Sequence, residues 1–234
     1  MFITRLCAKR LSNYDSQKSI GSKLRARRIV PLKEMIEESF HENGSVSIID
    51  VGGTESYWGI LPRQYIDEYK VTITIANLPG ITMQTDHGPF RFIEADGCDL
   101  SEFRDFSFNI AHSNSVLEHV GDWGCMVKFA NEISRVSEKY FVQTPNYWFP
   151  IEPHFMTPFF HWLPKPTRLW LVSHFKLGSW KSATSIDEAV RMVESARLLN
   201  KKMLQGLFPN ANILVEKLFF LPKSFIAIKH QQGN

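Results

Sequence analysis

Cysteine is scarce in this chain. Its three cysteines, Cys7, Cys98 and Cys125, are scattered among 234 residues and form no C-x-x-C pair. Without such a pair, the sequence gives little support for a cysteine-based zinc site or a redox motif. A sparse and odd number of cysteines is typical of proteins in a reducing compartment, so we expect a cytoplasmic location.

Long apolar runs and a strong net charge are also missing. No apolar run reaches the roughly 18–20 residues that are needed to cross a membrane. The N-terminal segment lacks the continuous apolar stretch of a signal peptide, and its basic, acid-poor composition favours a transit peptide only weakly. The formal net charge of +3 at pH 7 is too small to imply binding to nucleic acid.

Several common catalytic signatures are absent as well. The chain contains no P-loop G-x-x-x-x-G-K-[ST], no H-E-x-x-H metalloprotease motif and no G-x-S-x-G nucleophile elbow. It also contains no internal repeat and no low-complexity tract. What remains is a globular composition, with 44% hydrophobic and 22% charged residues, at a length suited to one α/β domain.

The most informative stretch is an apolar run at residues 48–51, which is typical of a buried parallel strand. Asp50 stands near its C-terminal end, and Gly52 and Gly53 follow directly. Glycine lets the backbone turn sharply and approach a ligand closely. Because ligands of open α/β sheets bind beyond the carboxyl ends of the strands, this stretch predicts a nucleotide-type site. An ordinary strand-to-helix turn is the alternative.

Two further polar positions follow predicted strands. Alternating β-branched residues predict a strand over residues 71–78, which carries Asn77 where an acid usually holds ribose hydroxyls. Asp96 and Gly97 follow a short predicted strand at residues 91–95. Both places also suit ordinary turns, because Asn, Asp and Gly favour them in any protein.

Two motifs carry a resemblance to a known family. Residues 50–56, D-V-G-G-T-E-S, resemble motif I of the class I S-adenosylmethionine (SAM) methyltransferases, D/E-x-G-x-G-x-G, with Thr54 and Ser56 at two glycine positions. Residues 106–120, F-S-F-N-I-A-H-S-N-S-V-L-E-H-V, resemble motif IV of small-molecule SAM methyltransferases of the type 11 and quinone O-methyltransferase-like group. In the second motif Asn109 replaces the usual aspartate.

The resemblance implies an α/β fold of the Rossmann-like class I methyltransferase type. We therefore expect a mostly parallel seven-stranded sheet with helices on both faces and a C-terminal antiparallel hairpin, which residues 211–221 and 224–229 would form. Residues 1–40 are expected to be a basic arm and a first helix over residues 29–40, and residues 41–234 the methyltransferase domain. A second clear helix is predicted over residues 185–204.

The resemblance also implies SAM as cofactor and assigns two groups of site residues. The first group would bind the cofactor: Asp50, Gly52, Gly53, Asn77, Asp96, Gly97, Ser113 and Asn114. The second would bind the substrate or carry the catalysis, with His119 and His154 as the catalytic candidates: Ser115, Glu118, His119, Tyr147, Trp148, Glu152 and His154. Each histidine can serve as a general base or orient the substrate, and each can equally hold a structural hydrogen bond.

An aromatic, proline-rich stretch at residues 147–180 is interpreted as a substrate lid, because apolar walls with a few polar groups are typical of binding pockets. A packed plug that only caps the core is the alternative. Residues 170–180 would also allow peripheral contact with a membrane or a partner. No metal is expected, since Ser115 replaces the first acid of the E-x-x-E-H metal motif. Its remaining members, Glu118 and His119, would point about 100° apart on a helix.

We therefore predict a SAM-dependent methyltransferase that acts on a small-molecule acceptor. The expected acceptor group is a hydroxyl of a partly apolar, lipid-linked or saccharide molecule. The alternative is a non-catalytic methyltransferase-like protein that serves binding or assembly, which the missing motif I glycines and Asn77 favour. An NAD(P)-dependent oxidoreductase is disfavoured by the absence of G-x-G-x-x-G. The oligomeric state is left open.

Overall fold

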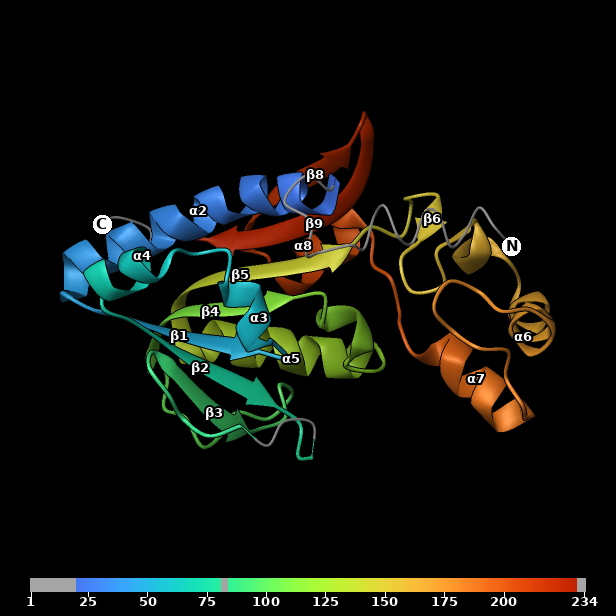
Figure 1. Cartoon of the computed structure of the whole chain (residues 1–234), viewed down its shortest axis with the longest axis horizontal. Helices are drawn as coiled ribbons and strands as arrows, with labels where there is room; N and C mark the ends of the chain where they lie inside the picture. The colour runs from blue at the N-terminus through green and yellow to red at the C-terminus, as the bar shows by residue number, and fades with distance from the viewer. Residues whose placement is uncertain (1–19, 81–83, 231–234) are drawn as a thin grey trace.

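Seven strands form one central sheet in the order β3-β2-β1-β4-β5-β9-β8 (Figure 1). The computed structural model describes residues 20–80 and 84–230. Strands β1 to β5 run parallel, whereas β9 is antiparallel to both β5 and β8. The predicted parallel sheet with a C-terminal antiparallel hairpin is thus confirmed. The strands are β1 (Val46–Val51), β2 (Val71–Asn77), β3 (Phe90–Glu94), β4 (Phe108–Asn114), β5 (Ser137–Pro145), β8 (Asn212–Leu218) and β9 (Leu221–Lys229).

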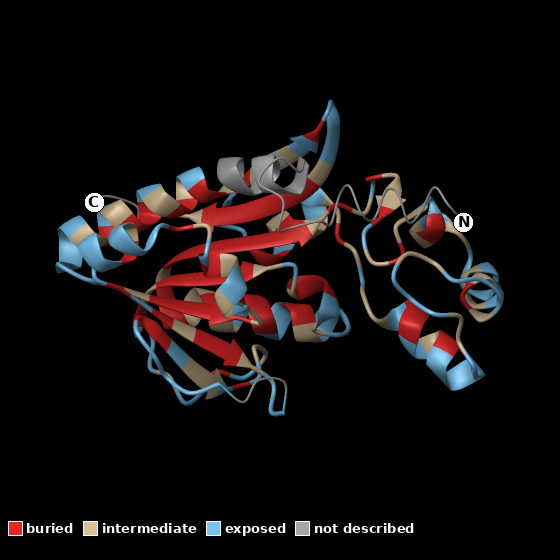
Figure 2. Cartoon of the chain, in the orientation of Figure 1, coloured by how far each residue is buried: buried red, intermediate tan, exposed pale blue. Residues whose placement is uncertain are grey.

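Helices cover both faces of this sheet, as predicted. Helices α2 (Ile20–Asn43) and α4 (Arg63–Glu68) pack on one face, and α5 (Trp123–Val136) and α8 (Lys201–Leu207) pack on the other. Successive residues of a strand point to opposite faces, so Ile48 joins the first cluster and Ile49 the second. The central strands are therefore buried on both sides (Figure 2), which explains their continuous apolar sequence.

Two predicted helices differ from the structure. The first helix begins at Ile20 instead of residue 29, so Pro31 lies in its interior rather than in its first turn. Apolar packing of the flanking residues on the sheet outweighs the missing N–H of the proline. The helix predicted over residues 185–204 is two helices, α7 (Ile186–Glu194) and α8. Asn200 separates them because its side chain accepts the backbone N–H of Met203 and caps α8.

The turn after β1 leads into a short helix, α3 (Glu55–Trp58), followed by α4. Gly59 and Pro62 lie between these two helices and keep the crossover short and irregular. The basic arm expected at the N terminus falls mainly on residues 1–19 and on the side chains of residues 20–27, which lie outside what the structure describes. Among the described helices, none is long and apolar enough to pass through a membrane.

Residues 146–200, called here the post-β5 segment, connect β5 to α8. The segment contains β6 (Ile151–Glu152), β7 (Thr157–Pro158), η2 (Phe160–Trp162), α6 (Lys165–His174) and α7. It has its own apolar cluster, in which Phe155, Phe160 and Val172 pack against α7. Its two ends meet where the N–H of Tyr147 donates to the carbonyl of Leu199 over 2.9 Å. The segment lies beyond the carboxyl ends of the parallel strands (Figure 1).

Candidate functional site

Asp50, the acid at the end of β1, is fully buried, and its carboxylate accepts hydrogen bonds from other residues of the protein. Trp58 Nε1 donates to its Oδ2 over 2.8 Å, and His112 Nδ1 donates to its Oδ1 over 2.7 Å. His112 is opposite Asp50 in the sheet register, and its Nε2 is buried without a partner among the described residues. The carboxylate therefore joins β1, β4 and α3, a network that the sequence motif did not predict.

Gly52 and Gly53 are both required by the packing of the chain itself. Gly52 has φ +75°, and a Cβ there would meet Val116 Cγ1 at 2.6 Å. A Cβ on Gly53 would stand 1.8 Å from Asp50 Oδ2. The motif I glycines thus face protein side chains, so Gly52→Val would strain the fold in addition to any effect on a ligand. It is no clean test of cofactor binding.

Asn77 and Asp96 lie at the carboxyl ends of β2 and β3, as predicted. Asn77 Nδ2 donates to the carbonyl of Gly53 over 3.0 Å and so ties β2 to the turn after β1. Asp96 is exposed, and its Oδ1 accepts the backbone N–H of Cys98 over 2.9 Å. Gly97 packs tightly, because a Cβ there would come within 2.7 Å of Val51 Cγ1.

The polar end of β4 is held by hydrogen bonds within the protein. Ser113 is buried and donates to the carbonyl of Val51 over 3.0 Å. Asn114 Oδ1 accepts from Arg28 Nη1 over 2.5 Å. Ser115, at φ +58°, donates to Gln143 Oε1 over 2.8 Å. These residues shape the edge of the sheet, and only Ser115 of the predicted three is exposed.

The structure brings four of the predicted substrate and catalytic residues into one cluster. His119, from the short helix η1 (Leu117–His119), meets His154 of the post-β5 segment with the two Nε2 atoms 3.0 Å apart. Glu152 Oε1 accepts from His154 Nδ1 over 2.7 Å. The carboxylate of Glu118 is buried beside them, and its Oε2 accepts from Thr144 Oγ1 over 2.9 Å.

Burial sets the protonation of this cluster. It raises the pKa of Glu118 to about 7, because the ionised carboxylate has lost its water. Burial also lowers the pKa of His119. It would lower the pKa of His154 too, but the hydrogen bond to Glu152 and its charge outweigh burial and raise that pKa. His154 therefore holds a proton more readily than His119 does.

Tyr147 and Trp148 lie at the start of the post-β5 segment. The carbonyl of Tyr147 accepts from His161 Nε2 over 2.7 Å and from Trp162 Nε1 over 2.9 Å. These bonds fold the aromatic stretch back on itself. Trp148 is 63% exposed and packs edge-on to Tyr147. The predicted aromatic stretch therefore contains both a packed part and a solvent-facing part.

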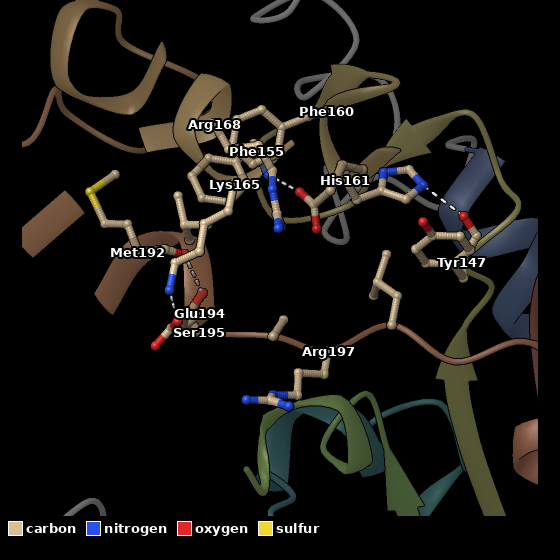
Figure 3. A pocket seen from close by; sticks show the side chains of 14 residues that line it. Tyr147, Phe155, Phe160, His161, Lys165, Arg168, Met192, Glu194, Ser195 and Arg197 are labelled. Atoms are coloured by element: carbon tan, nitrogen blue, oxygen red, sulfur yellow. Dashed lines mark hydrogen bonds and ion pairs between the residues drawn. The ribbon is translucent and has the colours of Figure 1, made fainter. Parts of the chain in front are cut away.

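A cavity of about 350 Å³ lies in the post-β5 segment (Figure 3). Glu152, which belongs to the Glu–His cluster, is one of the residues that line it. Its apolar wall includes Phe155 and Phe160, and its polar groups include Lys165, Arg168 and Arg197. Lys165 pairs with Glu194 across the cavity. In contrast, the buried Nε of Arg168 and the buried Nδ1 of His161 have no partner in the described part of the chain.

Sequence reasoning missed several residues of this site. Thr144 lies near the end of β5 and carries no sequence signal for a site. Ser195, whose carbonyl accepts from His119 Nδ1 over 2.6 Å, carries none either. Arg168 and Arg197 are ordinary basic residues of a polar stretch until the fold places them at one cavity. Backbone carbonyls and isolated arginines carry no local pattern, so only the tertiary structure identifies them.

No protein-family model matches the sequence, and no curated protein matches it. Solved structures are similar at low identity. An O-methyltransferase family protein from Burkholderia thailandensis is 13% identical, with a TM-score of 0.49, over 89% of this chain but only 58% of that protein. A SAM-dependent methyltransferase from Methanosarcina mazei is 16% identical, with a TM-score of 0.45, over 79% and 91% of the two chains. PigF with SAH is 15% identical, with a TM-score of 0.44, over 88% of this chain and 63% of that one.

The low sequence identities and TM-scores say nothing about substrate or activity. The strand order of the sheet is the better evidence for the fold. The order reverses between β1 and β4, as in doubly wound sheets. The antiparallel β9 between β5 and β8 distinguishes the sheet from NAD-type sheets, which are parallel to their end. The chain therefore has the Rossmann-like α/β architecture that the resemblance predicts, a mostly parallel seven-stranded sheet that ends in an antiparallel hairpin.

Proposed function

We propose that this protein is a SAM-dependent methyltransferase that acts on a small-molecule acceptor. The observation that carries the proposal is the position of the post-β5 segment. It lies beyond the carboxyl ends of the parallel strands and places His154 at 3.0 Å from His119, just after β4. In open α/β sheets, the crevice at that edge is where ligands bind.

Two acceptor groups at the edge support a site for the adenosine part of SAM. The amide nitrogen of Asn77 donates to the carbonyl of Gly53, so its Oδ1 would be the atom that accepts from a ribose hydroxyl. Asp96 is exposed and has acceptor capacity beyond its bond to Cys98, so it would accept from the adenine amino group. The motif I residues Asp50, Gly52 and Gly53 would act indirectly, by fixing the turn after β1. When bound, SAM would supply an electrophilic methyl group on a cationic sulfur.

The chain's own contribution would be alignment, exclusion of water and removal of one proton. The sulfur leaves as a neutral thioether, so no departing charge needs stabilising, and positioning can supply much of the rate. The post-β5 segment would act as the lid. Because Nδ1 of both His119 and His154 donates to a protein oxygen, Nε2 is the basic nitrogen of each ring. The two Nε2 atoms, 3.0 Å apart, would together take up the proton of an acceptor hydroxyl.

The cavity in the post-β5 segment indicates the type of acceptor. Aromatic walls and the unpartnered Nε of Arg168, among the described residues, suit a partly apolar molecule that also carries polar or anionic groups. A lipid-linked or saccharide acceptor would meet both conditions. Exposed aromatic side chains at Trp148, Phe219 and Phe220 are consistent with a lipid-bearing substrate presented at a membrane surface.

A non-catalytic binding protein is the second candidate, and the turn after β1 favours it. Both oxygens of Asp50 are used by Trp58 and His112, and side chains of the protein occupy the Cβ side of Gly52 and Gly53. A protein of this kind would keep the fold while losing affinity for SAM.

Cofactor binding separates the two candidates. We expect SAM and S-adenosylhomocysteine to give heat in isothermal titration and to raise the melting temperature, whereas NADH does neither. Asp96→Ala should weaken SAM binding by about 10-fold or more, because a hydrogen bond to a charged group is worth about 1.5–3 kcal/mol. Glu102→Ala, a change at a nearby exposed acid, is the matched control. Absence of heat and of a thermal shift with both ligands would refute the methyltransferase proposal.

The roles of the histidines are tested by kinetics. His119→Ala should lower turnover by on the order of 10²–10⁴-fold, the usual contribution of general acid–base catalysis. It should leave the Kd for SAM unchanged, because His119 lies on the acceptor side of the edge. An equal loss of turnover and of SAM affinity would instead assign His119 a structural role.

A further inference from the structure

We propose that Glu118, His119 and His154 together bind one divalent transition-metal ion of the zinc class. The three residues offer one carboxylate oxygen and two imidazole nitrogens, all within 4.8 Å of one another. The site follows from the arrangement of these side chains and does not rest on the proposed methyl transfer. A bound ion would occupy the Nε2 lone pairs, so the general-base role proposed above belongs to the metal-free protein.

The contact between the two histidines calls for a cation. His119 Nδ1 donates to the carbonyl of Ser195, and His154 Nδ1 donates to the carboxylate of Glu152. Each Nδ1 therefore carries a hydrogen, and in the neutral ring the remaining Nε2 bears a lone pair. At 3.0 Å the two Nε2 atoms must share a cation. That cation is either a proton, which makes an N–H···N hydrogen bond, or a metal ion that both lone pairs bind.

Glu118 supplies the second indication. Its side chain is buried, and its Oε1 has no hydrogen-bond partner among the residues that the structure describes. A buried polar atom without a partner costs free energy, and a buried carboxylate without a counter-charge costs more. A cation bound to Oε1 would remove both costs.

Each proposed ligand is already oriented by a second residue. Ser195 and Glu152 hold the two imidazoles, and Thr144 Oγ1 donates to the other oxygen of Glu118 over 2.9 Å. In metal sites, such outer contacts fix the tautomer and direction of the ligands. The Glu152–His154 pair in particular has the carboxylate–histidine arrangement that supports a metal-bound imidazole.

The ligand types select the class of metal. Two imidazoles and one carboxylate suit Zn²⁺ or a similar ion, whereas Mg²⁺ and Ca²⁺ prefer oxygen ligands throughout. With Zn–N bonds of roughly 2.0–2.1 Å, tetrahedral geometry places two nitrogens about 3.3 Å apart. The present 3.0 Å separation needs only a small opening. Three protein ligands leave a fourth position for water or a substrate atom, as catalytic zinc sites do.

The local sequence pattern does not reveal this site, because its third ligand comes from a different part of the chain. Glu118 and His119 alone cannot surround an ion. His154, 35 residues later, completes the set only after the post-β5 segment has folded over the edge of the sheet. The cavity of about 350 Å³ shares Glu152 and Ser195 with the cluster, so a small ligand could reach the ion from there.

Zinc binding by the full-length chain without a histidine tag tests the proposal. We expect isothermal titration with ZnCl₂ to show one site per chain, and Zn²⁺ to raise the melting temperature. Mg²⁺ at the same concentration should do neither. His154→Ala should weaken Zn²⁺ binding by on the order of 100-fold or more, and Glu152→Gln by about 10–100-fold, the usual effect of an outer-contact residue.

His174→Ala is the matched control, since this histidine lies on α6 and bonds to the carbonyl of Trp170, away from the cluster. Cys98→Ser controls for zinc held by the two neighbouring free cysteines. Circular dichroism and the melting temperature without metal establish that each variant is folded. If the folded wild type binds no Zn²⁺, or if His154→Ala binds it as tightly as His174→Ala does, the proposed site is wrong. Either result leaves SAM binding, measured separately, unaffected.

Discussion

Adding a single methyl group at Gly53 tests whether the turn after β1 is shaped by the protein itself. A Cβ placed there lies 1.8 Å from Asp50 Oδ2 and 2.1 Å from Asp50 Cγ. Gly53 does not have a positive φ, so alanine meets no conformational penalty from the backbone. The main cost of Gly53→Ala should therefore come from displacing the Asp50 carboxylate, which supplies the three atoms nearest to that Cβ.

The size of that cost follows from the contacts of Asp50. Moving its carboxylate breaks the hydrogen bonds from Trp58 Nε1 at 2.8 Å and from His112 Nδ1 at 2.7 Å. Each bond to a charged group contributes about 1.5–3 kcal/mol, and all three side chains are buried, so water cannot replace the lost partners. Gly53→Ala should therefore lower the free energy of unfolding by about 3–6 kcal/mol.

Urea denaturation at neutral pH measures this change, with Gly206→Ala as the control. Gly206 lies in α8, and nothing is within 4 Å of the position that a methyl group would take there, so alanine should stabilise the protein by about 0.4–1 kcal/mol. A double-mutant cycle isolates the cause. In an Asp50→Ala background the clash is gone, and Gly53→Ala should then cost less than about 1 kcal/mol.

Two results would refute this reasoning. The first is a change in unfolding free energy of under about 1 kcal/mol for Gly53→Ala, which is within the range of ordinary substitutions. The second is an equal cost in the wild type and in the Asp50→Ala background. Either result would mean that the methyl group does not act through Asp50.

Three more predictions concern the frame around the site. Burial would raise the pKa of Glu216, but Arg28 outweighs it and holds that pKa below the ordinary 4.5. Stability from this pair should thus be complete above pH 4.5 and fall as the pH drops through the lower, folded-state pKa, and Arg28→Met should flatten that fall in urea titrations at several pH values. Phe129→Ala, at a fully buried side chain, should cost about 3–5 kcal/mol in the same assay, and a cost under about 1 kcal/mol would contradict the packing described. Phe220→Ser, at a side chain 83% exposed, should change stability by no more than about 0.5 kcal/mol, and a larger loss would mean that the hairpin tip is packed.

Much of the fold is predictable because its signals are local. Apolar runs such as residues 48–51 predict strands buried on both faces. The antiparallel pairing of the last two strands was instead implied by the resemblance to class I methyltransferases. The short crossover after β1 also follows from nearby Gly59 and Pro62. In contrast, Pro31 inside α2 was not predictable, since packing against the sheet overrides the local preference of proline.

The strand ends that carry the candidate site residues were predictable, but the contacts that these residues make were not. Asp50 and Gly53 were expected to serve a cofactor, and in the structure they also pack against each other. His119 and His154 are separate catalytic candidates in the sequence, and their contact at 3.0 Å appears only in the folded chain. The cofactor assignments of Asn77 and Asp96 stay predictions until SAM binding is measured.

The sequence by itself determined which stretches become buried strands, where the chain turns, and which polar residues follow the strands, because backbone preference and apolar periodicity depend on near neighbours. Only the tertiary structure decided which polar groups meet. Asp50 and His112 are 62 residues apart, and His119 and the carbonyl of Ser195 are 76 apart. Such contacts depend on strand order and on how the post-β5 segment folds over the sheet. These contacts form because buried polar groups must find hydrogen-bond partners anywhere in the chain. No local pattern encodes which partner each group finds.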